Sequence, residues 1–256
     1  MAEHPAFEHV NPGGAGPALL LCDHASNAVP PDVAGGDLGL PAEEMARHIA
    51  WDIGARGVTL GLAGLMDAPA LLTRFSRLVI DPNRGEDDPT LVMRLYDGAI
   101  VPANRRIAPA EVARRLDAWH RPYHAEIDAL LDARAAAGRP TAIVAIHSFT
   151  PRLAGRSPRP WHIGVLHGHD VRLAAPLIAR LRAEPDLCVG VNQPYAGELE
   201  GDTLSRHGTR RGGRHVLIEV RQDLIADEAG QRAWAERLAP MLTDAIAASE
   251  EEPRHG

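Results

Sequence analysis

The chain has 256 residues, of which 45% are hydrophobic and 24% are charged, values typical of a globular protein in water. All 27 basic residues are arginine, so a Schiff-base lysine and a phosphate-loop lysine are both excluded. The formal net charge of −7 argues against nonspecific nucleic-acid binding, and no apolar run is long enough to span a bilayer. Because the two cysteines are far apart and no basic-plus-apolar leader is visible, we expect a cytoplasmic protein without disulfides.

The hydrophobic pattern alternates along the chain between short strands and helical stripes. Short apolar runs predict strands at residues 18–22, 71–73, 78–80, 142–146, 163–166 and 216–218. Pro41, followed by two glutamates, predicts the start of a helix that extends past Asp52. Steps of three and four from Val112 to Leu130 predict a second helix, and residues 234–241 carry the stripe of a third.

This alternation predicts an α/β sandwich in a single domain over residues 1–256, with loose ends at about 1–16 and 249–256. Ligands of such sheets bind at the edge where strand ends and loops meet. His24, Asn83-Arg84, His147 and Glu219 each lie near the end of a predicted strand, so we expect them to converge at that edge.

Two imidazoles beside a carboxylate are the ingredients of a catalytic zinc site. His24 and His147 form the best pair of ligands, and Glu219 is the best general base. A metal held there would polarise a carbonyl group and lower the pKa of a water molecule. The alternative is that all three are ordinary polar residues at strand ends.

Six segments add a more specific pattern: CDHASNAVP at 22–30, FSRLVIDPNR at 75–84, IHSFTP at 146–151, NQPY at 192–195, Thr203 with His207-Gly208, and IEVRQDLI at 218–225. In this order they resemble the N-formylglutamate amidohydrolase family. The resemblance implies the fold of zinc exopeptidases and cell-wall amidases, a three-layer α/β sandwich with a central mixed, mostly parallel sheet. It also implies Zn²⁺, or another divalent metal, on His24, His147 and a carboxylate, with Glu219 as general base.

The third metal ligand is an open choice at this stage. Carboxypeptidases have a glutamate three residues after the first histidine, where this chain has Asn27, and an amide oxygen is a poorer zinc ligand than a carboxylate. Cell-wall amidases take the carboxylate from the following helix, which favours Asp52. Asn27, Glu44, His48 and Asp23 remain possible ligands.

Other polar residues are candidates for substrate binding. Arg77 and Arg84 suit substrate carboxylates, because a planar guanidinium matches a carboxylate with two hydrogen bonds. We assign Asn83 and Ser148 to substrate orientation, and His207 to a catalytic contact with the oxyanion or leaving group. The competing interpretations are structural salt bridges for the arginines and an ordinary loop position for His207.

Further features carry weaker signals. His120 and His124 share a helix face but lack the glutamate of a metalloprotease helix, so packing is favoured over metal binding. A loop turn is favoured at residues 167–170, and the arginines at 206–214 are either an anion site or a solvated cluster. No Gly-x-Ser-x-Gly elbow supports serine chemistry.

We therefore expect a metal-dependent hydrolase that cleaves the amide bond of a small, acidic N-formyl or N-acyl amino acid. We expect no nucleic-acid or membrane partner, and the sequence sets neither the acyl group nor the oligomeric state. The alternatives are an amidase or peptidase for larger peptides and a non-catalytic family member that binds an acidic metabolite.

Overall fold

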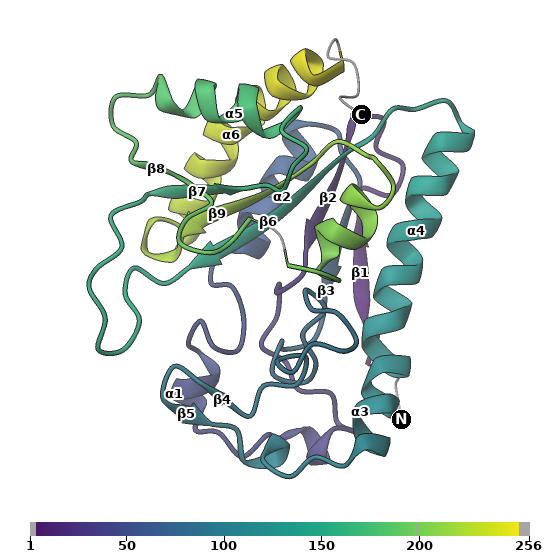
Figure 1. Ribbon diagram of the computed structural model, residues 1–256, viewed down its shortest axis with the longest axis vertical. Coiled ribbons are helices and arrows are strands. Elements are labelled where there is room, and N and C mark those ends of the chain that lie inside the picture. The colour runs from purple at the N-terminus through teal and green to yellow at the C-terminus, as the bar shows by residue number, and fades with distance from the viewer. Residues whose placement is uncertain (1–3, 198, 251–256) are drawn as a thin grey trace.

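The computed structural model describes residues 4–197 and 199–250 (Figure 1). A seven-stranded sheet forms the centre, with the strand order β1-β3-β2-β6-β9-β7-β8. β1 is antiparallel to β3 and β7 is antiparallel to β9, whereas the pairs β3–β2, β2–β6, β6–β9 and β7–β8 are parallel. The strands are β1 (Phe7–Val10), β2 (Ala18–Cys22), β3 (Ala70–Thr73), β6 (Ala142–Phe149), β7 (Ile163–Leu166), β8 (Val189–Val191) and β9 (His215–Arg221).

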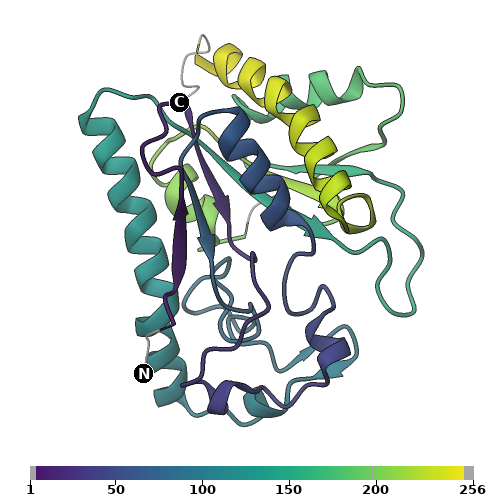
Figure 2. The same ribbon diagram turned by 180° about the vertical axis from the view of Figure 1, so that it is seen from behind.

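Helices cover both faces of this sheet (Figures 1 and 2). On one face, α2 (Ala55–Leu65), α5 (Ala174–Arg182) and α6 (Glu228–Glu250) pack against the side chains of Leu20 and Ile146. On the other face, Tyr123 and Ile127 of α4 (Arg121–Ala136) pack against Leu21. Successive strand residues point to opposite faces, so central strands covered on both sides are apolar throughout. The predicted three-layer sandwich with a mixed, mostly parallel sheet is confirmed.

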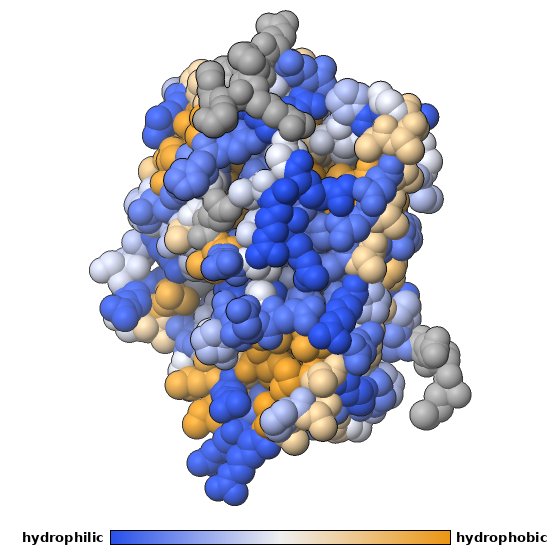
Figure 3. All heavy atoms as spheres, turned by 45° about the vertical axis from the view of Figure 1, so that its right-hand side comes forward, coloured by the Kyte–Doolittle hydropathy of each residue, from blue (hydrophilic) through white to orange (hydrophobic). Residues whose placement is uncertain are grey.

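The predicted long helix is present as one nearly continuous helical segment. It consists of α3 (Pro109–Arg115), a π-helical turn η3 (Leu116–His120) and α4. Pro122 has no N–H group to donate to the preceding turn, which accounts for the wider turn before α4. The side of the molecule that carries α4 has a mostly hydrophilic surface, with an apolar patch in its lower part (Figure 3).

Two long segments lie beyond the carboxyl ends of β2 and β3 and form the lower part of Figure 1. Residues 23–54 include η1 (Ala34–Gly36) and α1 (Ala42–Met45), and residues 74–108 include the hairpin β4 (Leu95–Tyr96) and β5 (Ala99–Ile100), followed by η2 (Pro102–Asn104). Phe75, Val79, Ile80 and Trp119 contribute to a separate apolar cluster there. Two short elements flank β9, namely η4 (Ser205–Thr209) and η5 (Gln222–Leu224).

The structure corrects several details of the sequence prediction. Residues 78–80 form a turn and not a strand, because their apolar side chains fill the separate cluster of the long segments. Phe7–Val10, within the expected loose start, is the edge strand β1. His147 and Glu219 lie inside β6 and β9, whereas they were expected just after strands. At the other end, α6 continues to Glu250, and residues 251–256 lie outside the described residues.

The prediction of a helix from Pro41 past Asp52 is correct only for the first turn. Helix α1 ends at Met45, and Asp52 lies in the loop before α2. Gly54 ends this loop with a φ of +81°, in the left-handed region that favours glycine. A Cβ atom at this position would collide with the Ile225 carbonyl oxygen, so the close approach also requires glycine. Among the described residues, no helix combines the length and the apolar character needed to cross a membrane.

Candidate metal centre and active site

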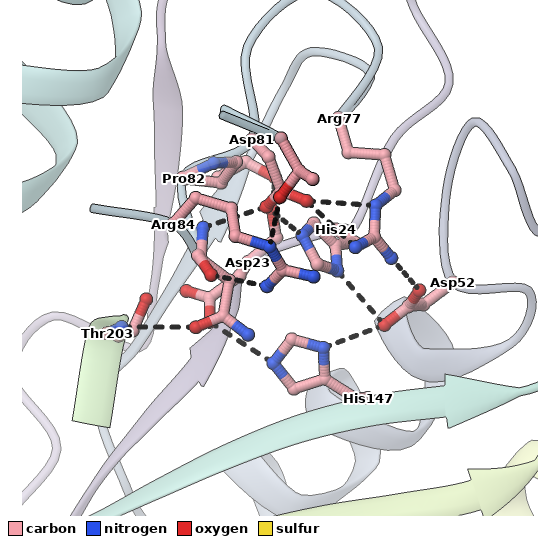
Figure 4. Close-up of polar contacts among 12 residues, drawn as sticks. Asp23, His24, Asp52, Arg77, Asp81, Pro82, Arg84, His147 and Thr203 are labelled. Atoms are coloured by element: carbon pink, nitrogen blue, oxygen red, sulfur yellow. Dashed lines mark hydrogen bonds and ion pairs between the residues drawn. The ribbon is translucent and has the colours of Figure 1, made fainter. Parts of the chain in front are cut away.

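Three buried side chains from separate parts of the chain converge at the carboxyl edge of the sheet (Figure 4). His24, Asp52 and His147 each offer one ligand atom, and these atoms lie within 4.8 Å of one another. His24 follows β2 and His147 lies in the parallel neighbour β6, so the strand pairing brings the two imidazoles together. The Asp52 amide donates a hydrogen bond to the His24 carbonyl oxygen at 3.0 Å, which holds the Asp52 loop beside His24.

Both imidazoles direct Nδ1 toward the same oxygen of Asp52. Asp52 Oδ2 lies 3.3 Å from His24 Nδ1 and 2.8 Å from His147 Nδ1. The opposite nitrogens face two further aspartates, with His24 Nε2 2.7 Å from Asp81 Oδ1 and His147 Nε2 3.1 Å from Asp23 Oδ2. A carboxylate that accepts the Nε2 proton fixes the ring and leaves Nδ1 as the ligand atom.

Arg77 and Tyr123 hold the carboxylates in turn. Arg77 Nη2 donates to Asp81 Oδ2 at 2.8 Å and Nη1 donates to Asp52 Oδ1 at 3.4 Å, while the Tyr123 hydroxyl donates to Asp23 Oδ1 at 2.7 Å. Burial alone would raise the pKa of Asp81, but Arg77 and the adjacent imidazole hold it well below its usual range. The Asp81 carboxylate is therefore ionised and able to accept a hydrogen bond from His24 Nε2.

The donor set and the local charge fit a divalent cation. Two imidazole nitrogens and one carboxylate oxygen match the three protein ligands of catalytic zinc sites, which leave a further position open. The three carboxylates of Asp23, Asp52 and Asp81 outnumber the two guanidinium groups of Arg77 and Arg84 at the site. Burial would lower the pKa of His147, but its contacts with Asp23 and Asp52 raise it well above its ordinary value. In the metal-free protein a proton thus supplies positive charge where a cation would sit.

Glu219 lies next to this group in the sheet, because its position on β9 pairs with His147 on β6. Its side chain is buried, and Oε2 has no hydrogen-bond partner among the described residues. Burial raises the pKa of this carboxyl group from 4.5 to about 8. A buried carboxyl group with a raised pKa, facing a cavity beside three convergent ligands, has the properties of a catalytic acid or base.

The cavity has a volume of about 400 Å³ and brings most of the predicted site residues together. Arg84 donates from Nε to the Thr90 hydroxyl and from Nη1 to the Asn83 carbonyl oxygen. Asn83 Oδ1 accepts the Thr203 amide proton, and the Ser148 hydroxyl donates to the Ile53 carbonyl oxygen. The predicted residues that line the cavity are His24, Asp52, Arg77, Asn83, Arg84, His147, Ser148 and Glu219.

His207 is placed differently from the other predicted residues. Among the described residues that line the cavity His207 does not appear, and its ring instead contacts His124 and Asp128. The residues that compete with Asp52 as third ligand also differ in position. Asn27 Nδ2 donates to the Met45 carbonyl oxygen, and Glu44 pairs with Arg47, so neither joins the two imidazoles as Asp52 does.

His48 and Asp23, which also compete with Asp52 as third ligand, do lie near the site. His48 lines the cavity and Asp23 is the Nε2 partner of His147, but the group that could hold a metal contains neither. The roles of Asp23 and Asp81 as imidazole partners were missed. Asp23 directly precedes His24 in the first of the six segments, and Asp81 lies between Arg77 and Arg84 in the second. Their positions in these segments were the signal that could have identified them. Tyr96, in β4, and Tyr195, the last residue of the NQPY segment, also line the cavity.

Fold and site together define a three-layer α/β protein with a buried His–Asp–His group and an adjacent buried carboxyl group in one cavity. The model of the N-formylglutamate amidohydrolase family matches residues 16–226. The chain belongs to this family, which confirms the resemblance seen in the six sequence segments.

Two solved structures share the fold of this chain. The crystal structure of gene product Atu2144 from Agrobacterium tumefaciens is 38% identical, covers 98% of both chains and superposes with a TM-score of 0.92. The N-formylglutamate amidohydrolase from Ralstonia eutropha JMP134 shares the fold at 23% identity and a TM-score of 0.65, over 96% of this chain and 98% of that one. No curated protein matches the chain significantly.

Proposed function

We propose that the protein is a metal-dependent hydrolase that cleaves the amide bond of small N-formyl or N-acyl amino acids. The observation that carries this proposal is the unpartnered carboxyl oxygen of Glu219 beside the His24–Asp52–His147 group, inside a cavity of about 400 Å³. That volume lies within the range of small-molecule pockets, roughly 300–1,000 Å³, which favours a small substrate over a long peptide. Membership of the family supports the amidohydrolase class.

We assign the metal to His24 Nδ1, His147 Nδ1 and Asp52, with Zn²⁺ as the expected ion. A divalent ion there would polarise the scissile carbonyl group and lower the pKa of a water molecule. Asp81 and Asp23 keep the two rings oriented by accepting hydrogen bonds from their Nε2–H groups.

Glu219 is the proposed general base. Its carboxylate takes a proton from the attacking water and delivers this proton to the leaving nitrogen, so one group serves both steps. Glu219 must be ionised to act as a base. Its pKa of about 8 applies to the protein without a metal ion, in which burial disfavours the negative charge. An opposite charge within a few ångströms favours the ionised form, so a cation on the adjacent ligands would prepare Glu219 for this role.

Arg84 is the proposed partner of the substrate carboxylate, with Asn83 and Ser148 orienting the rest of the molecule. Its guanidinium group lines the cavity while Nε and Nη1 are fixed by Thr90 and Asn83. A fixed guanidinium group loses little conformational freedom when it binds a carboxylate. Arg77 is already bonded to Asp81 and Asp52, so we assign it to holding these carboxylates.

The test is hydrolysis by the zinc-reconstituted protein of a panel of N-formyl and N-acetyl amino acids with acidic and neutral side chains. Glu219→Gln should lower kcat at least ~100-fold while the protein stays folded and binds metal. The matched control is Glu228→Gln, the same substitution at an exposed residue of α6, which should behave like the wild type. Near-normal turnover by Glu219→Gln would remove Glu219 from the mechanism, and a metal-loaded wild type that hydrolyses no compound of the panel would reject the substrate class.

A further inference from the structure

Two histidines on the long helical segment hold the loop that carries Asp81 and Arg84. His120 Nε2 lies 2.9 Å from the Arg84 carbonyl oxygen, and His124 Nε2 lies 2.9 Å from the Pro82 carbonyl oxygen. Both oxygens can only accept, so each imidazole donates its Nε2 proton. The spacing of four residues noticed in the sequence therefore serves two successive contacts to residues 82–84. Figure 4 shows that this loop lies directly against His24.

The second of these histidines continues into a longer chain of hydrogen bonds. His124 Nδ1 lies 2.8 Å from His207 Nε2, and His207 Nδ1 lies 3.0 Å from Asp128 Oδ1. The two imidazoles are stacked with a ring-centroid distance of 5.1 Å and are both buried. Asp128 lies at the surface with a side-chain exposure of 45%, so the chain connects the loop to solvent.

The end groups of this hydrogen-bond chain, the Pro82 carbonyl oxygen and the Asp128 carboxylate, determine how many protons the two imidazoles must carry. The Pro82 carbonyl oxygen and the Asp128 carboxylate accept, so the outer nitrogen of each ring must carry a proton. The contact between the two inner nitrogens needs one more proton. Three hydrogen bonds therefore need three protons on the four ring nitrogens, whereas two neutral imidazoles carry only two. When all three hydrogen bonds are formed, one of the two rings is an imidazolium, and Asp128 balances its charge.

We infer that His124 and His207 are positioning residues that share one extra proton and, through the Pro82 carbonyl oxygen, fix the Asp81–Arg84 segment against His24. The effect on catalysis rests on the proposed function, whereas the proton count rests on the contacts alone. The pair does not touch the substrate cavity itself among the described residues, so it acts through the loop.

The surroundings decide where the third proton is bound. Burial lowers the pKa of both histidines, and the positive charge of Arg206 on η4 acts in the same direction. Asp128 and, at the end of β2, Asp23 act in the opposite direction on His207. The remaining groups that face the pair are His120 on η3, the ring of Tyr123 on α4, and Arg211, which binds both Asp128 and Asp132. The pair therefore gains its third proton at a pH below the ordinary histidine value and loses it as the pH rises.

Asp128→Asn changes the proton count of this hydrogen-bond chain, and it also removes the contact of Arg211 Nη1 with Asp128 Oδ1, the atom that faces His207. The side-chain amide of the variant would donate to His207 Nδ1, His207 would donate to His124, and His124 would donate to Pro82. Two neutral rings then satisfy all three bonds at every pH. Asp132→Asn is the matched control, because Asp132 binds the same Arg211 but does not contact His207.

The first readout is the ¹⁵N resonances of the two rings during a pH titration of the purified protein. In the wild type and in Asp132→Asn, one ring should gain the doubly protonated signature as the pH falls below about 6.5, the ordinary histidine value. In Asp128→Asn this titration should vanish or move at least about one pH unit lower. Rings that stay neutral in the wild type down to about pH 5, or an unchanged titration in Asp128→Asn, would overturn the shared proton.

The second readout separates positioning from a structural role. The ratio of kcat/KM of the wild type to that of Asp128→Asn should fall about 5-fold as the pH rises through the titration of the pair, the effect of one hydrogen bond. A ratio that does not change with pH would overturn the positioning role. If no tested compound is hydrolysed by either protein, the proposed function fails, and the ring resonances still decide the proton count.

Discussion

Replacing Glu219 with glutamine measures how strongly the metal-free site disfavours a negative charge. Burial raises the pKa of Glu219 to about 8, against 4.5 for the same group in the unfolded chain. The folded protein thus holds this proton more tightly than the unfolded chain does. The resulting stability is fully present below pH 4.5 and is lost as the pH rises through about 8.

The magnitude follows from the difference of about 3.5 between these two values. At ~1.4 kcal/mol for each pH unit, the folded state loses about 5 kcal/mol of stability by pH 9. Glutamine cannot ionise, so the variant does not lose this contribution. For a chain of this length, the difference corresponds to about 10–20 °C in Tm.

Thermal unfolding of the chelator-treated proteins between pH 5 and pH 9 tests this expectation. Wild type and Glu219→Gln should unfold at similar temperatures near pH 5, and the variant should become increasingly more stable as the pH rises to 9. Glu228→Gln, which alters an exposed glutamate, should show no such trend. A difference between wild type and Glu219→Gln that stays constant over the whole range would refute the argument that burial raises the pKa of this group.

Three further predictions concern the metal ligands and the substrate. Asp81→Asn should weaken Zn²⁺ binding ~10–100-fold because His24 Nε2 loses its carboxylate partner, and an unchanged affinity in a competition titration would contradict this. Zn²⁺ binding near pH 7 should release about two protons, since His147 carries a proton in the metal-free protein and Glu219, with a pKa of about 8 there, should ionise beside the cation; calorimetry whose heats do not depend on the ionisation enthalpy of the buffer would count against it. Arg84→Gln should raise KM ~10–100-fold for substrates with a free carboxylate, with little change for carboxamide analogues, and equal losses for both would exclude the assigned contact.

The central layers of the fold could be predicted from the sequence because burial on both faces leaves a plain signal. Residues 18–22 and 142–146 are continuous apolar runs, as the central strands of a covered parallel sheet must be. The same reasoning fails at residues 78–80, where an equally apolar run forms a turn in a separate cluster. An apolar run shows that a segment is buried, but not which core buries it.

The site was partly predictable for a similar reason. His24 follows β2 and His147 lies in β6. These two strands are neighbours, so the convergence of the two histidines follows from the sheet. Asp52 reaches them from an irregular loop that Gly54 turns, and no periodicity encodes that path. The contacts of Asp81 and Asp23 with the two rings depend on side-chain directions, which strand and helix patterns do not specify.

The decisive measurement is the zinc content of the purified protein, made together with its hydrolysis of N-formyl amino acids. We expect about one Zn²⁺ per chain, loss of hydrolysis after chelation, recovery on addition of Zn²⁺, and no retained zinc in His147→Ala. A folded wild-type protein that hydrolyses these compounds at the same rate after complete removal of metal would contradict this expectation.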